Sequence, residues 1–456
     1  MNDVCFYRDG HHITFKQFCQ DVTQAQVAIK QTDAKRVLLF NTDSYQFSVW
    51  LFALIFENRH VLLPPNAQSG TLHQLASQCD ATAGSIILSG KPQIAALMAE
   101  HQEVSPQCLT REHFFKLFVG NITFYTSGST GEAKAIHKHC QQLTLEIATL
   151  KSEFSKLYQT SNIIVSTVSH QHIYGLLFKV LGPLLLGKTI VNQTFEYPEH
   201  IGRIFDELAE NNPTAMANGI LVSSPAHLQR LALDNVLAPY SQTFKGIFSS
   251  GGLLSLTTSQ ALLQQMNIAP TEVYGSTETG GIAWRCGQRS ADEPWQAFPN
   301  IKLQTSADSQ RLAIFSPYVV EQPYLTDDKV ELLDARHFLL KGRVDRTVKI
   351  EEKRVNLNQI ERQLVLHRWI AEARILVITN RSDSARTILA AVLVLTTDGQ
   401  ESLLENGKLA FNNMLKQHLL SDIERICLPK KWRYLTEFPY NSQGKLVLSD
   451  LEKLFD

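Results

Sequence analysis

The chain has 456 residues, of which 44% are hydrophobic and 19% are charged, and its formal net charge is −1. This length suffices for one large globular domain and a smaller one. A net charge near zero excludes an overall electrostatic attraction to nucleic acids or to anionic membranes, so any charged recognition surface must be local.

The start of the sequence and its most apolar segments predict neither a signal peptide nor a membrane span. Residues 1–15 lack a charged start followed by an apolar run. The apolar segment 48–56 is too short to cross a bilayer, and segment 173–187 contains Lys179 and Gly182. We therefore expect buried core at both places. We also expect a cytoplasmic protein whose seven scattered cysteines are reduced core residues rather than zinc ligands.

Short apolar runs alternate with helical patterns over most of the chain. Runs of apolar and β-branched residues predict strands at 36–40, 162–168, 188–193 and 245–252. Apolar residues spaced three to four apart predict helices at 46–56, 201–211 and 225–233. This alternation predicts a layered α/β fold with largely parallel sheets.

The sequence changes in character after Lys341. A highly charged stretch, 341–362, leads into a predicted helix, two strands, a further helix and a C-terminal tail. This succession predicts a separate small α+β domain. We place the boundary near Asp345, which divides the chain into domains 1–344 and 345–456, and we expect a hinge there.

A loop rich in glycine and hydroxyl residues follows the predicted strand 121–125. Its sequence is TSGSTGEAK, from Thr126 to Lys134. Because glycine lets the main chain approach a ligand closely, the N–H and hydroxyl groups of such a loop can bind a polyphosphate. The spacing is not that of a Walker A loop. Taken alone, these residues suit an ordinary polar turn as well.

Three further segments carry polar groups suited to a nucleotide. YGSTET (274–279) follows a short predicted strand and offers a carboxylate that can bind Mg²⁺ beside an aromatic ring that can stack on a base. Asp328 and Arg343 can bind ribose hydroxyls. Lys445 lies in the loop NSQGKL (441–446). An ordinary strand-end turn, a solvated ion pair and a solvent-exposed lysine are the respective alternatives.

The order and spacing of these segments resemble those of the ANL superfamily of adenylate-forming enzymes. This superfamily includes acyl- and aryl-CoA synthetases, adenylation domains of peptide synthetases and firefly luciferase. The resemblance extends over nearly all of the chain, from ITFKQF (13–18) to NSQGKL. It implies a large N-terminal layered α/β domain and a small α+β C-terminal domain on a hinge. It also implies that ATP and Mg²⁺ are used to convert a carboxylic acid into an acyl-adenylate, which then passes to a thiol.

The resemblance implies a role for each matching residue. The residues expected to bind ATP are Thr126, Ser127, Gly128, Ser129, Thr130, Gly131, Lys134, Tyr274, Gly275, Ser276, Asp328 and Arg343. The catalytic residues would be Lys445, Thr277, Glu278 and His172, with Glu278 and Thr126 also holding Mg²⁺ and Asp345 forming the hinge. The acyl pocket would be bordered by His172, Tyr174, Gly175, Ser250, Gly251 and Gly252, with His170 as an alternative to His172 or a structural residue.

Two departures from the superfamily pattern replace a glycine, and one of them concerns the second half of the reaction. Asp327 and Glu352 stand where relatives usually have glycine, and Glu352 falls beside the expected pantetheine path. Residues 341–362 hold seven basic residues against four acidic ones, and Lys430, Lys431 and Arg433 form a second basic cluster. Carrier proteins are usually acidic, so these charges favour an acyl carrier protein as the thiol acceptor, with free CoA as the alternative. Solvated hinge and helix faces would explain the same charges.

The pocket residues are small and polar, which suits an aryl or medium-sized acid. The chain as a whole resembles ligases of bacterial aryl polyene and fatty-acid-like gene clusters, which load acyl carrier proteins. Two other functions remain as alternatives. A luciferase-like oxygenase also forms an acyl-adenylate, and a degenerate binding module would hold ATP without turning it over.

Overall fold

The structure is a computed structural model that divides into two compact units. The first unit comprises Met1–Lys302 and Phe315–Tyr324, and the second comprises Leu303–Ile314 and Leu325–Asp456. The predicted domain boundary near Asp345 stays a prediction. The described residues are 3–94, 110–127, 133–195, 197, 200–211, 218–287, 290, 293–306, 310–343, 346–350, 353–380, 386–441 and 446–455.

The first unit contains a five-stranded sheet with the order β5-β3-β4-β6-β7. Its strands are β5 (Ala81–Gly84), β3 (Arg36–Phe40), β4 (His60–Leu63), β6 (Asn121–Ser127) and β7 (Ala133–His139). All neighbours are parallel except β6 and β7, which form an antiparallel pair. The predicted polyphosphate loop therefore joins the two strands of a hairpin.

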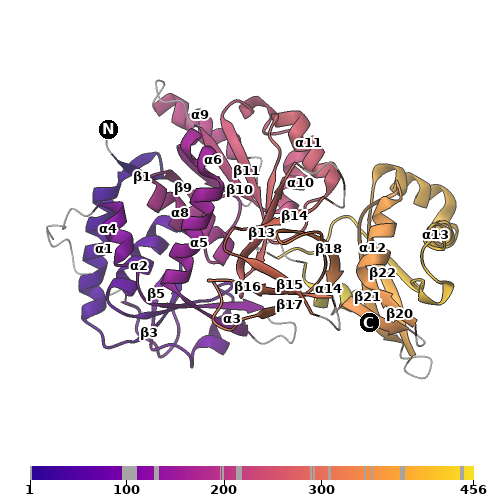
Figure 1. The fold of residues 1–456 in the computed structure, drawn as a ribbon, viewed down its shortest axis with the longest axis horizontal. Coiled ribbons are helices and arrows are strands. Elements are labelled where there is room, and N and C mark those ends of the chain that lie inside the picture. The colour runs from indigo at the N-terminus through magenta and orange to yellow at the C-terminus, as the bar shows by residue number, and fades with distance from the viewer. Residues whose placement is uncertain are drawn as a thin grey trace. The chain divides into compact units, whose positions relative to one another are not determined.

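Four of the described helices accompany this sheet. They are α1 (Phe15–Lys30), α2 (Ser44–Phe56), α3 (Ser69–Leu75) and α4 (Arg111–Lys116), and three of them, α1, α2 and α4, carry aromatic residues. In Figure 1, α1, α2 and α4 lie side by side, and Phe18, Phe52 and Phe114 bring their rings within 6 Å of one another. Helix α2 starts two residues earlier than predicted because the Asp43 side chain accepts the N–H of Gln46 at 2.8 Å. Residues 48–55 of this helix are all buried, so the apolar segment is core, as predicted.

A larger sheet in the first unit runs in the order β14-β13-β12-β11-β10-β8-β9-β1-β2. From β1 through β12 consecutive neighbours are parallel, whereas β2, β13 and β14 are antiparallel to their neighbours. The bounds are β1 Val4–Arg8, β2 His11–Thr14, β8 Ile163–Ser166, β9 Thr189–Thr194, β10 Gly219–Ser223, β11 Phe244–Ser249, β12 Thr271–Ser276, β13 Gly280–Cys286 and β14 Trp295–Ala297. Parallel strands end at one edge of a sheet, so the polar ends of β8, β10, β11 and β12 gather there.

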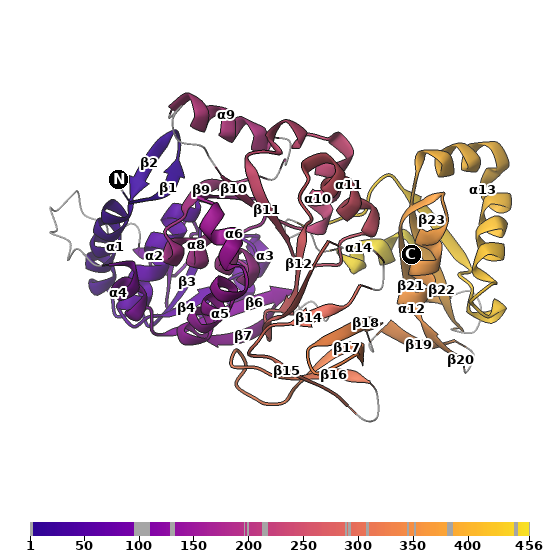
Figure 2. The same cartoon turned by 45° about the horizontal axis from the view of Figure 1, so that its top comes forward.

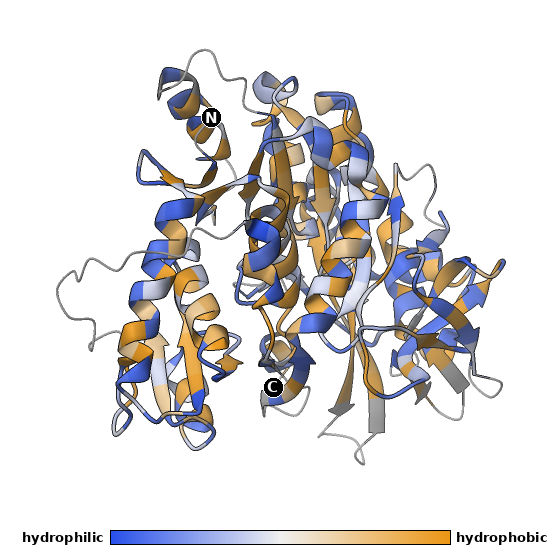
Figure 3. Cartoon of the chain, turned by 60° about the vertical axis from the view of Figure 1, so that its left-hand side comes forward, coloured by the Kyte–Doolittle hydropathy of each residue, from blue (hydrophilic) through white to orange (hydrophobic). Residues whose placement is uncertain are grey.

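Helices pack their apolar faces against this larger sheet. They include α5 (Cys140–Glu153), α6 (Ser155–Thr160), α9 (Ile201–Asn211), α10 (Pro225–Asp234) and α11 (Leu256–Met266). Leu228 of α10 and Leu262 of α11 share a buried cluster with Ile247 of β11, and Figure 2 shows both helices beside these strands. Hydrophobic residues follow the strands and the inner helix faces in Figure 3. The predicted layered α/β class is confirmed.

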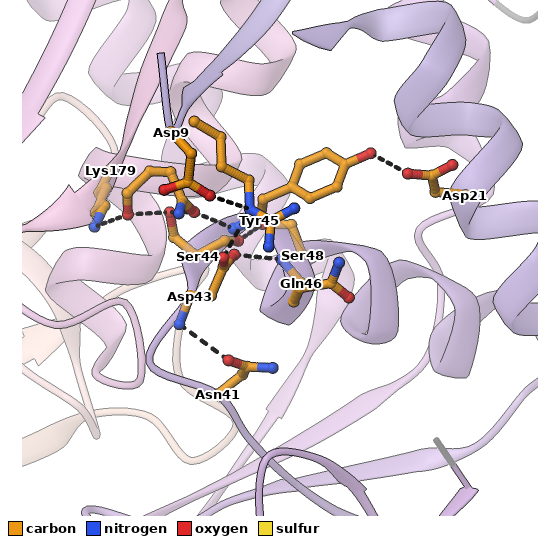
Figure 4. Close-up of polar contacts among 11 residues, drawn as sticks. Asp9, Asp21, Asn41, Asp43, Ser44, Tyr45, Gln46, Ser48 and Lys179 are labelled. Carbon is orange, nitrogen blue, oxygen red and sulfur yellow. Dashed lines mark hydrogen bonds and ion pairs between the residues drawn. The ribbon is translucent and has the colours of Figure 1, made fainter. Parts of the chain in front are cut away.

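The apolar segment 173–187 forms buried helical turns rather than one regular helix. A short helix α7 (Ile173–Gly175) continues into a π-helical turn, η2 (Leu176–Leu181), and then into α8 (Gly182–Leu186). Lys179 lies inside it with no exposed surface. Its Nζ donates to the Thr194 hydroxyl at 2.7 Å and to the main-chain oxygens of Asn192 and Gln193 at 3.2 Å. Asn192 in turn binds Ser44 and Tyr45 at the start of α2, so this polar cluster joins β9 of the larger sheet to α2. Figure 4 shows Ser44, Tyr45 and Lys179 of this cluster.

Lys179→Met is expected to flatten the alkaline side of the pH–stability profile. Burial lowers the pKa of Lys179 to about 7, so above that pH the unfolded chain binds more protons than the folded one. The free energy of unfolding therefore rises with pH in the wild type, by up to ~1.4 kcal/mol per pH unit between about pH 8 and 9. Urea unfolding of both proteins at these two pH values measures the difference. Equal slopes would contradict the prediction.

The described strands of the second unit form three groups, one of which is the antiparallel pair of β19 (Thr347–Ile350) and β20 (Lys353–Asn356). Another is β15 (Lys302–Thr305), β16 (Arg311–Phe315), β17 (Tyr324–Leu332) and β18 (His337–Arg343), of which β17 and β18 are antiparallel. The third is a three-stranded sheet in the order β21-β22-β23. Its bounds and those of the remaining elements are α12 Leu357–Leu366, β21 Ile370–Asn380, β22 Arg386–Leu395, α13 Thr397–Leu419, β23 Lys431–Leu435 and α14 Leu448–Glu452. Helices α12 and α13 share a core with this sheet, which forms an α+β arrangement.

Neither a membrane span nor a disulfide occurs in the described part of the chain. No helix there is long and apolar enough to cross a bilayer. Six cysteines are described and all are free; Cys286 is exposed, and the buried ones are Cys5, Cys19, Cys79, Cys140 and Cys427. Cys108 lies outside the described residues.

Candidate active site

The predicted polyphosphate loop begins where β6 ends. Thr126 lies near the end of this strand, directly opposite Lys134 in the register of β7. Ser127 is the last residue of β6, whereas Gly128, Ser129, Thr130 and Gly131 lie outside the described residues. The hairpin therefore places Thr126 and Lys134, which are eight positions apart in the sequence, side by side at the base of the loop.

The YGSTET motif forms a tight turn between β12 and β13. Tyr274, Gly275 and Ser276 end β12, and Thr277 and Glu278 lie in the turn. The Thr279 hydroxyl accepts the main-chain N–H of Ser276 at 2.9 Å, which closes the turn. Glu278 is thereby held at the strand end with its side chain 24% exposed.

An ion pair brings the two motifs together. Lys134 Nζ lies 2.7 Å from Glu278 Oε1, although the two residues are 144 positions apart in the sequence. Burial acts to raise the pKa of Glu278, but the hydrogen bonds that the carboxylate accepts, above all from Lys134, hold that pKa below its ordinary value. The carboxylate is therefore ionised at neutral pH and faces the base of the loop.

Tyr274 packs beside Trp295 of the neighbouring β14. Their ring centroids are 5.5 Å apart. The guanidinium of Arg285 lies 4.4 Å from the Trp295 ring centroid and forms a buried ion pair with Glu272 of β12 at 2.8 Å. The second Glu272 oxygen accepts the N–H of Leu254 at 2.9 Å. These contacts hold β12, which carries the motif, and they were not predicted from the sequence.

Two buried charged residues that contact the YGSTET turn were also not predicted from the sequence. Lys138 of β7 and Glu146 of α5 are each 4% exposed. Burial lowers the pKa of Lys138 and raises that of Glu146, while their mutual attraction opposes both shifts. Periodicity could have revealed them: Lys138 lies two positions after the buried Ile136, and Glu146 lies on the same helix face as the buried Leu150.

The predicted acyl pocket lies at the ends of parallel strands. Ser223 at the end of β10 is opposite Ser249 at the end of β11. Within the described part of the chain, the buried hydroxyls of Ser224 and Ser249 have no hydrogen-bond partner, and the buried Tyr174 hydroxyl lies beside the main chain of Ser223. Ser224 was not predicted, although Ser223 and Ser224 stand at the end of β10 much as Ser249 and Ser250 stand at the end of β11. Such orphaned polar groups are typical of sites that bind a ligand.

The other predicted pocket residues lie near these strand ends or shape them. Ser250 donates its hydroxyl to the Val273 carbonyl at 2.8 Å, whereas Gly251 and Gly252 are exposed. At Gly175 the chain approaches itself closely, because a Cβ there would lie 2.1 Å from the Ser169 carbonyl oxygen. This contact fixes the turn that carries Tyr174.

The two histidines of this region differ in environment. His170 is buried; its Nε2 lies 2.8 Å from the Asn41 carbonyl oxygen, and its ring centroid lies 4.6 Å from that of Phe47. Burial lowers the pKa of His170 to about 3, so its imidazole is neutral. His172, by contrast, is only half-buried and precedes α7. These contacts fit the structural role that we gave as an alternative for His170.

The remaining predicted residues belong to the second unit or lie outside the described residues. Asp328 of β17 is paired with Arg343 of β18 in the strand register. Asp327, one of the two expected departures from the superfamily pattern, forms an ion pair with Arg311 at 2.8 Å. Asp345, predicted as the hinge, Lys445, predicted as catalytic, and Glu352 lie outside the described residues.

Comparisons with known proteins agree with this geometry. The family model described as AMP-binding enzyme matches residues 122–312, a range that includes both motifs of the ion pair. The 4-coumarate–CoA ligase of Halorhodospira halophila is 28% identical over 325 residues, which cover 71% of this chain and 74% of that protein. The D-alanine–D-alanyl carrier protein ligase of Staphylococcus epidermidis is 23% identical over 71% of this chain and 69% of its own length.

The fold is also that of solved relatives. The crystal structure of ATP-bound MatB from Rhodopseudomonas palustris superposes with a TM-score of 0.72 at 15% identity, covering 98% of this chain and 94% of the other. Two motifs joined by an ion pair, a matching family model and ligases among the relatives support one conclusion. The chain belongs to the ANL superfamily of adenylate-forming enzymes and is an AMP-forming acid–thiol ligase.

Proposed function

We propose that this ligase activates an aryl or medium-sized carboxylic acid at the site where Lys134 meets Glu278. The observation that carries the proposal is their 2.7 Å ion pair, because it joins the base of the polyphosphate loop to the YGSTET turn. A cationic and an anionic group at one place suit a triphosphate that arrives with a divalent cation. Lys134 would contact the phosphates, and Glu278 would face the cation.

The residues present fit Mg²⁺ bound together with ATP. Mg²⁺ is usually held by one or two carboxylates, by water and by the phosphates of the substrate, rather than by a cage of protein ligands. Glu278 supplies one ionised carboxylate, and Thr126 supplies a hydroxyl on the strand that also faces Lys134. Within the described residues, no group of three or more acidic, histidine or cysteine side chains could hold a metal alone. The ion would neutralise phosphate charge.

The reaction joins two anions, and the remaining predicted residues would position them. A carboxylate oxygen attacks the α-phosphorus, the bond to pyrophosphate breaks, and the acyl-adenylate remains bound. Lys445 and Thr277 would stabilise charge at the α-phosphate, while Tyr274 would stack on adenine. Asp328 and Arg343, paired across β17 and β18, would hold the ribose hydroxyls.

The acid would bind at the ends of β10 and β11. Tyr174, Ser224 and Ser249 bring buried hydroxyls there, and the Phe178 ring lies 4.9 Å from both the Tyr174 and the Phe248 rings. A pocket walled by aromatic rings and containing a few polar groups suits an aryl or medium-sized acid. His172 would border its mouth.

Tyr174→Phe is expected to raise the KM for the acid by about tenfold or less, since it removes one buried hydroxyl. The KM for ATP is expected to stay unchanged, because Tyr174 lies on α7, whereas Lys134 lies on β7 and Glu278 in the turn between β12 and β13. Pyrophosphate exchange with each substrate varied in turn measures both constants. Tyr240→Phe, which removes a surface contact to Asp206, serves as the control. An equal change in both KM values would contradict the assignment.

For the second half-reaction we propose an acyl carrier protein as the thiol acceptor. The thiol sulfur attacks the acyl carbon, AMP leaves, and the thiol proton is released. The proposal relies on the basic surplus of residues 341–362, on the Lys430–Arg433 cluster and on Glu352. The carrier protein ligase among the relatives provides a precedent.

Free CoA is the second candidate, and two observations favour it. Several relatives are CoA ligases by name. Part of the basic surplus is also neutralised within the second unit, because Lys341 pairs at 2.7 Å with Glu331, which lies outside the segment 341–362. The charge available to steer an acidic partner is therefore smaller than the sequence predicts.

Pyrophosphate exchange across a panel of aliphatic and aromatic acids tests the first half-reaction. The preferred acid is then offered with holo acyl carrier protein and CoA side by side, and both thioesters are followed. We expect exchange with aryl or medium acids and faster transfer to the carrier protein, with a rate that falls as ionic strength rises. Efficient turnover with CoA and none with the carrier protein would contradict the acceptor proposal. If no acid in the panel supported pyrophosphate exchange, both the proposed activation of the acid and the proposed transfer to a thiol would be contradicted.

A further inference from the structure

Two oppositely charged side chains lie on the inner side of the turn that carries Glu278. Lys138 is near the end of β7, and Glu146 is in the second turn of α5. Both are nearly excluded from solvent at 4% exposure. Placing two charges inside a protein costs several kcal/mol per ion unless their partners are well arranged. Their partners are therefore informative.

Lys138 binds main-chain oxygens on either side of the site. Its Nζ donates to the carbonyl of Glu278 at 2.7 Å and to the carbonyl of Tyr318 at 2.7 Å. An ammonium group has donors and no acceptor, so these carbonyls are suitable partners. Tyr318 is itself held by its hydroxyl, which donates to Thr149 of α5 at 2.7 Å. Lys138 thus ties the residue that carries the carboxylate to a fixed part of the core.

Glu146 binds the other side of the same turn. Its Oε1 accepts the main-chain N–H of Gly281 at 2.6 Å. The approach depends on the two glycines that follow the motif: a Cβ at Gly280, where φ is +67°, would lie 2.6 Å from Glu146 Oε2. The main chain is therefore anchored at Glu278 and again at Gly281, and the turn between these points has little freedom to move.

We infer that Lys138 and Glu146 are positioning residues for nucleotide use, acting through the main chain of the turn to hold the Glu278 carboxylate opposite Lys134. The inference rests on the proposed role of Glu278. Glu278 is 24% exposed and pairs with a lysine that is 58% exposed, so the ion pair alone is a weak restraint. Orientation must come from the main chain, and the two buried charges supply it from behind.

A graded series at Glu146 tests this arrangement. Glu146→Gln keeps an oxygen that can accept the Gly281 N–H, whereas Glu146→Leu removes it. We expect Glu146→Leu to lower kcat/KM for Mg²⁺-ATP by up to about 10²-fold, since small displacements at a reacting site have effects of that size. Glu146→Gln is expected to restore most of the loss. The KM for the acid, whose pocket lies at other strand ends, is expected to change little.

A double-mutant cycle with Glu278→Gln separates positioning from general damage. If Glu146 acts through the Glu278 carboxylate, Glu146→Leu should lower kcat/KM for Mg²⁺-ATP by only about threefold or less when Glu278 is already replaced by glutamine. An undiminished factor in the Glu278→Gln background would overturn the inference alone. If Glu278→Gln had the same kinetics with Mg²⁺-ATP as the wild type, the proposed role of Glu278 would be wrong, and the present inference would be wrong with it.

A second variant guards against a simple failure to fold. Lys138→Met with Glu146→Leu removes both charges together, so neither buried charge is left without the opposite one nearby. We expect this protein to unfold cooperatively near the wild-type temperature while losing Mg²⁺-ATP use. Hydrogen exchange of the 276–281 peptide should speed up in it. A folded double variant with normal kcat/KM for Mg²⁺-ATP would overturn the inference.

Discussion

Replacing Lys445 by alanine is expected to slow acyl-adenylate formation by about 10²–10³-fold, the usual range for losing one stabiliser of transition-state charge. The lysine lies in the glycine-containing segment NSQGKL, and by resemblance it matches the superfamily residue that bridges the carboxylate and the α-phosphate. Because the attacking carboxylate and the α-phosphate are both anions, a cation is needed between them. Transfer of a supplied acyl-adenylate to the thiol should be far less affected, because no new charge of that kind develops there.

Pyrophosphate exchange and single-turnover thioester formation measure the two half-reactions separately. Lys408→Ala is a matched control, since Lys408 lies on the exposed side of α13 in the same unit. A fall of similar size in both half-reactions would show that Lys445 does not have the assigned role.

Glu278→Gln is expected to lower kcat/KM for ATP by about 10–10²-fold at low Mg²⁺, with partial recovery as Mg²⁺ is raised. Glutamine keeps the shape and one acceptor oxygen but contributes no charge to the cation. It also leaves Lys134 without its ion-pair partner. Since the pKa of Glu278 lies below its ordinary value, the wild-type activity should not depend on the ionisation of this residue above about pH 5.

Steady-state kinetics over a range of Mg²⁺ concentrations, at fixed ATP, give the comparison. Glu207→Gln on the exposed side of α9 provides the same chemical change away from the site. If the Glu278 variant shows wild-type Mg²⁺ dependence, the cation is held elsewhere.

The sequence predicted local structure well where a single periodicity dominated. Strand β3 and helix α9 have the predicted bounds, because β-branched and amphipathic patterns are local properties. The buried segment 173–187 was predicted as core, but its π-helical turn was not, since a uniformly apolar run has no periodicity to distinguish helix types.

The candidate site was predictable only as an ordered set of motifs. Nothing in the spacing of Lys134 and Glu278 shows that they meet, because the contact joins two different sheets. Lys138 and Glu146 were missed for a related reason. An isolated charge in a strand or helix usually faces solvent, and only the three-dimensional neighbours show what these two bind.

The Lys134–Glu278 pair also bears on whether the unliganded site accepts a nucleotide without a divalent cation. Each residue already has a counterion, so a bare triphosphate that takes Lys134 leaves the carboxylate facing another anion. A nucleotide complexed with a divalent cation offers both residues a new counterion at once. Because the pair is partly exposed, exchanging partners costs about 1 kcal/mol or less. If Lys134 and Glu278 have the roles we propose, we expect the resting site to discriminate against metal-free nucleotide before any bond is made or broken.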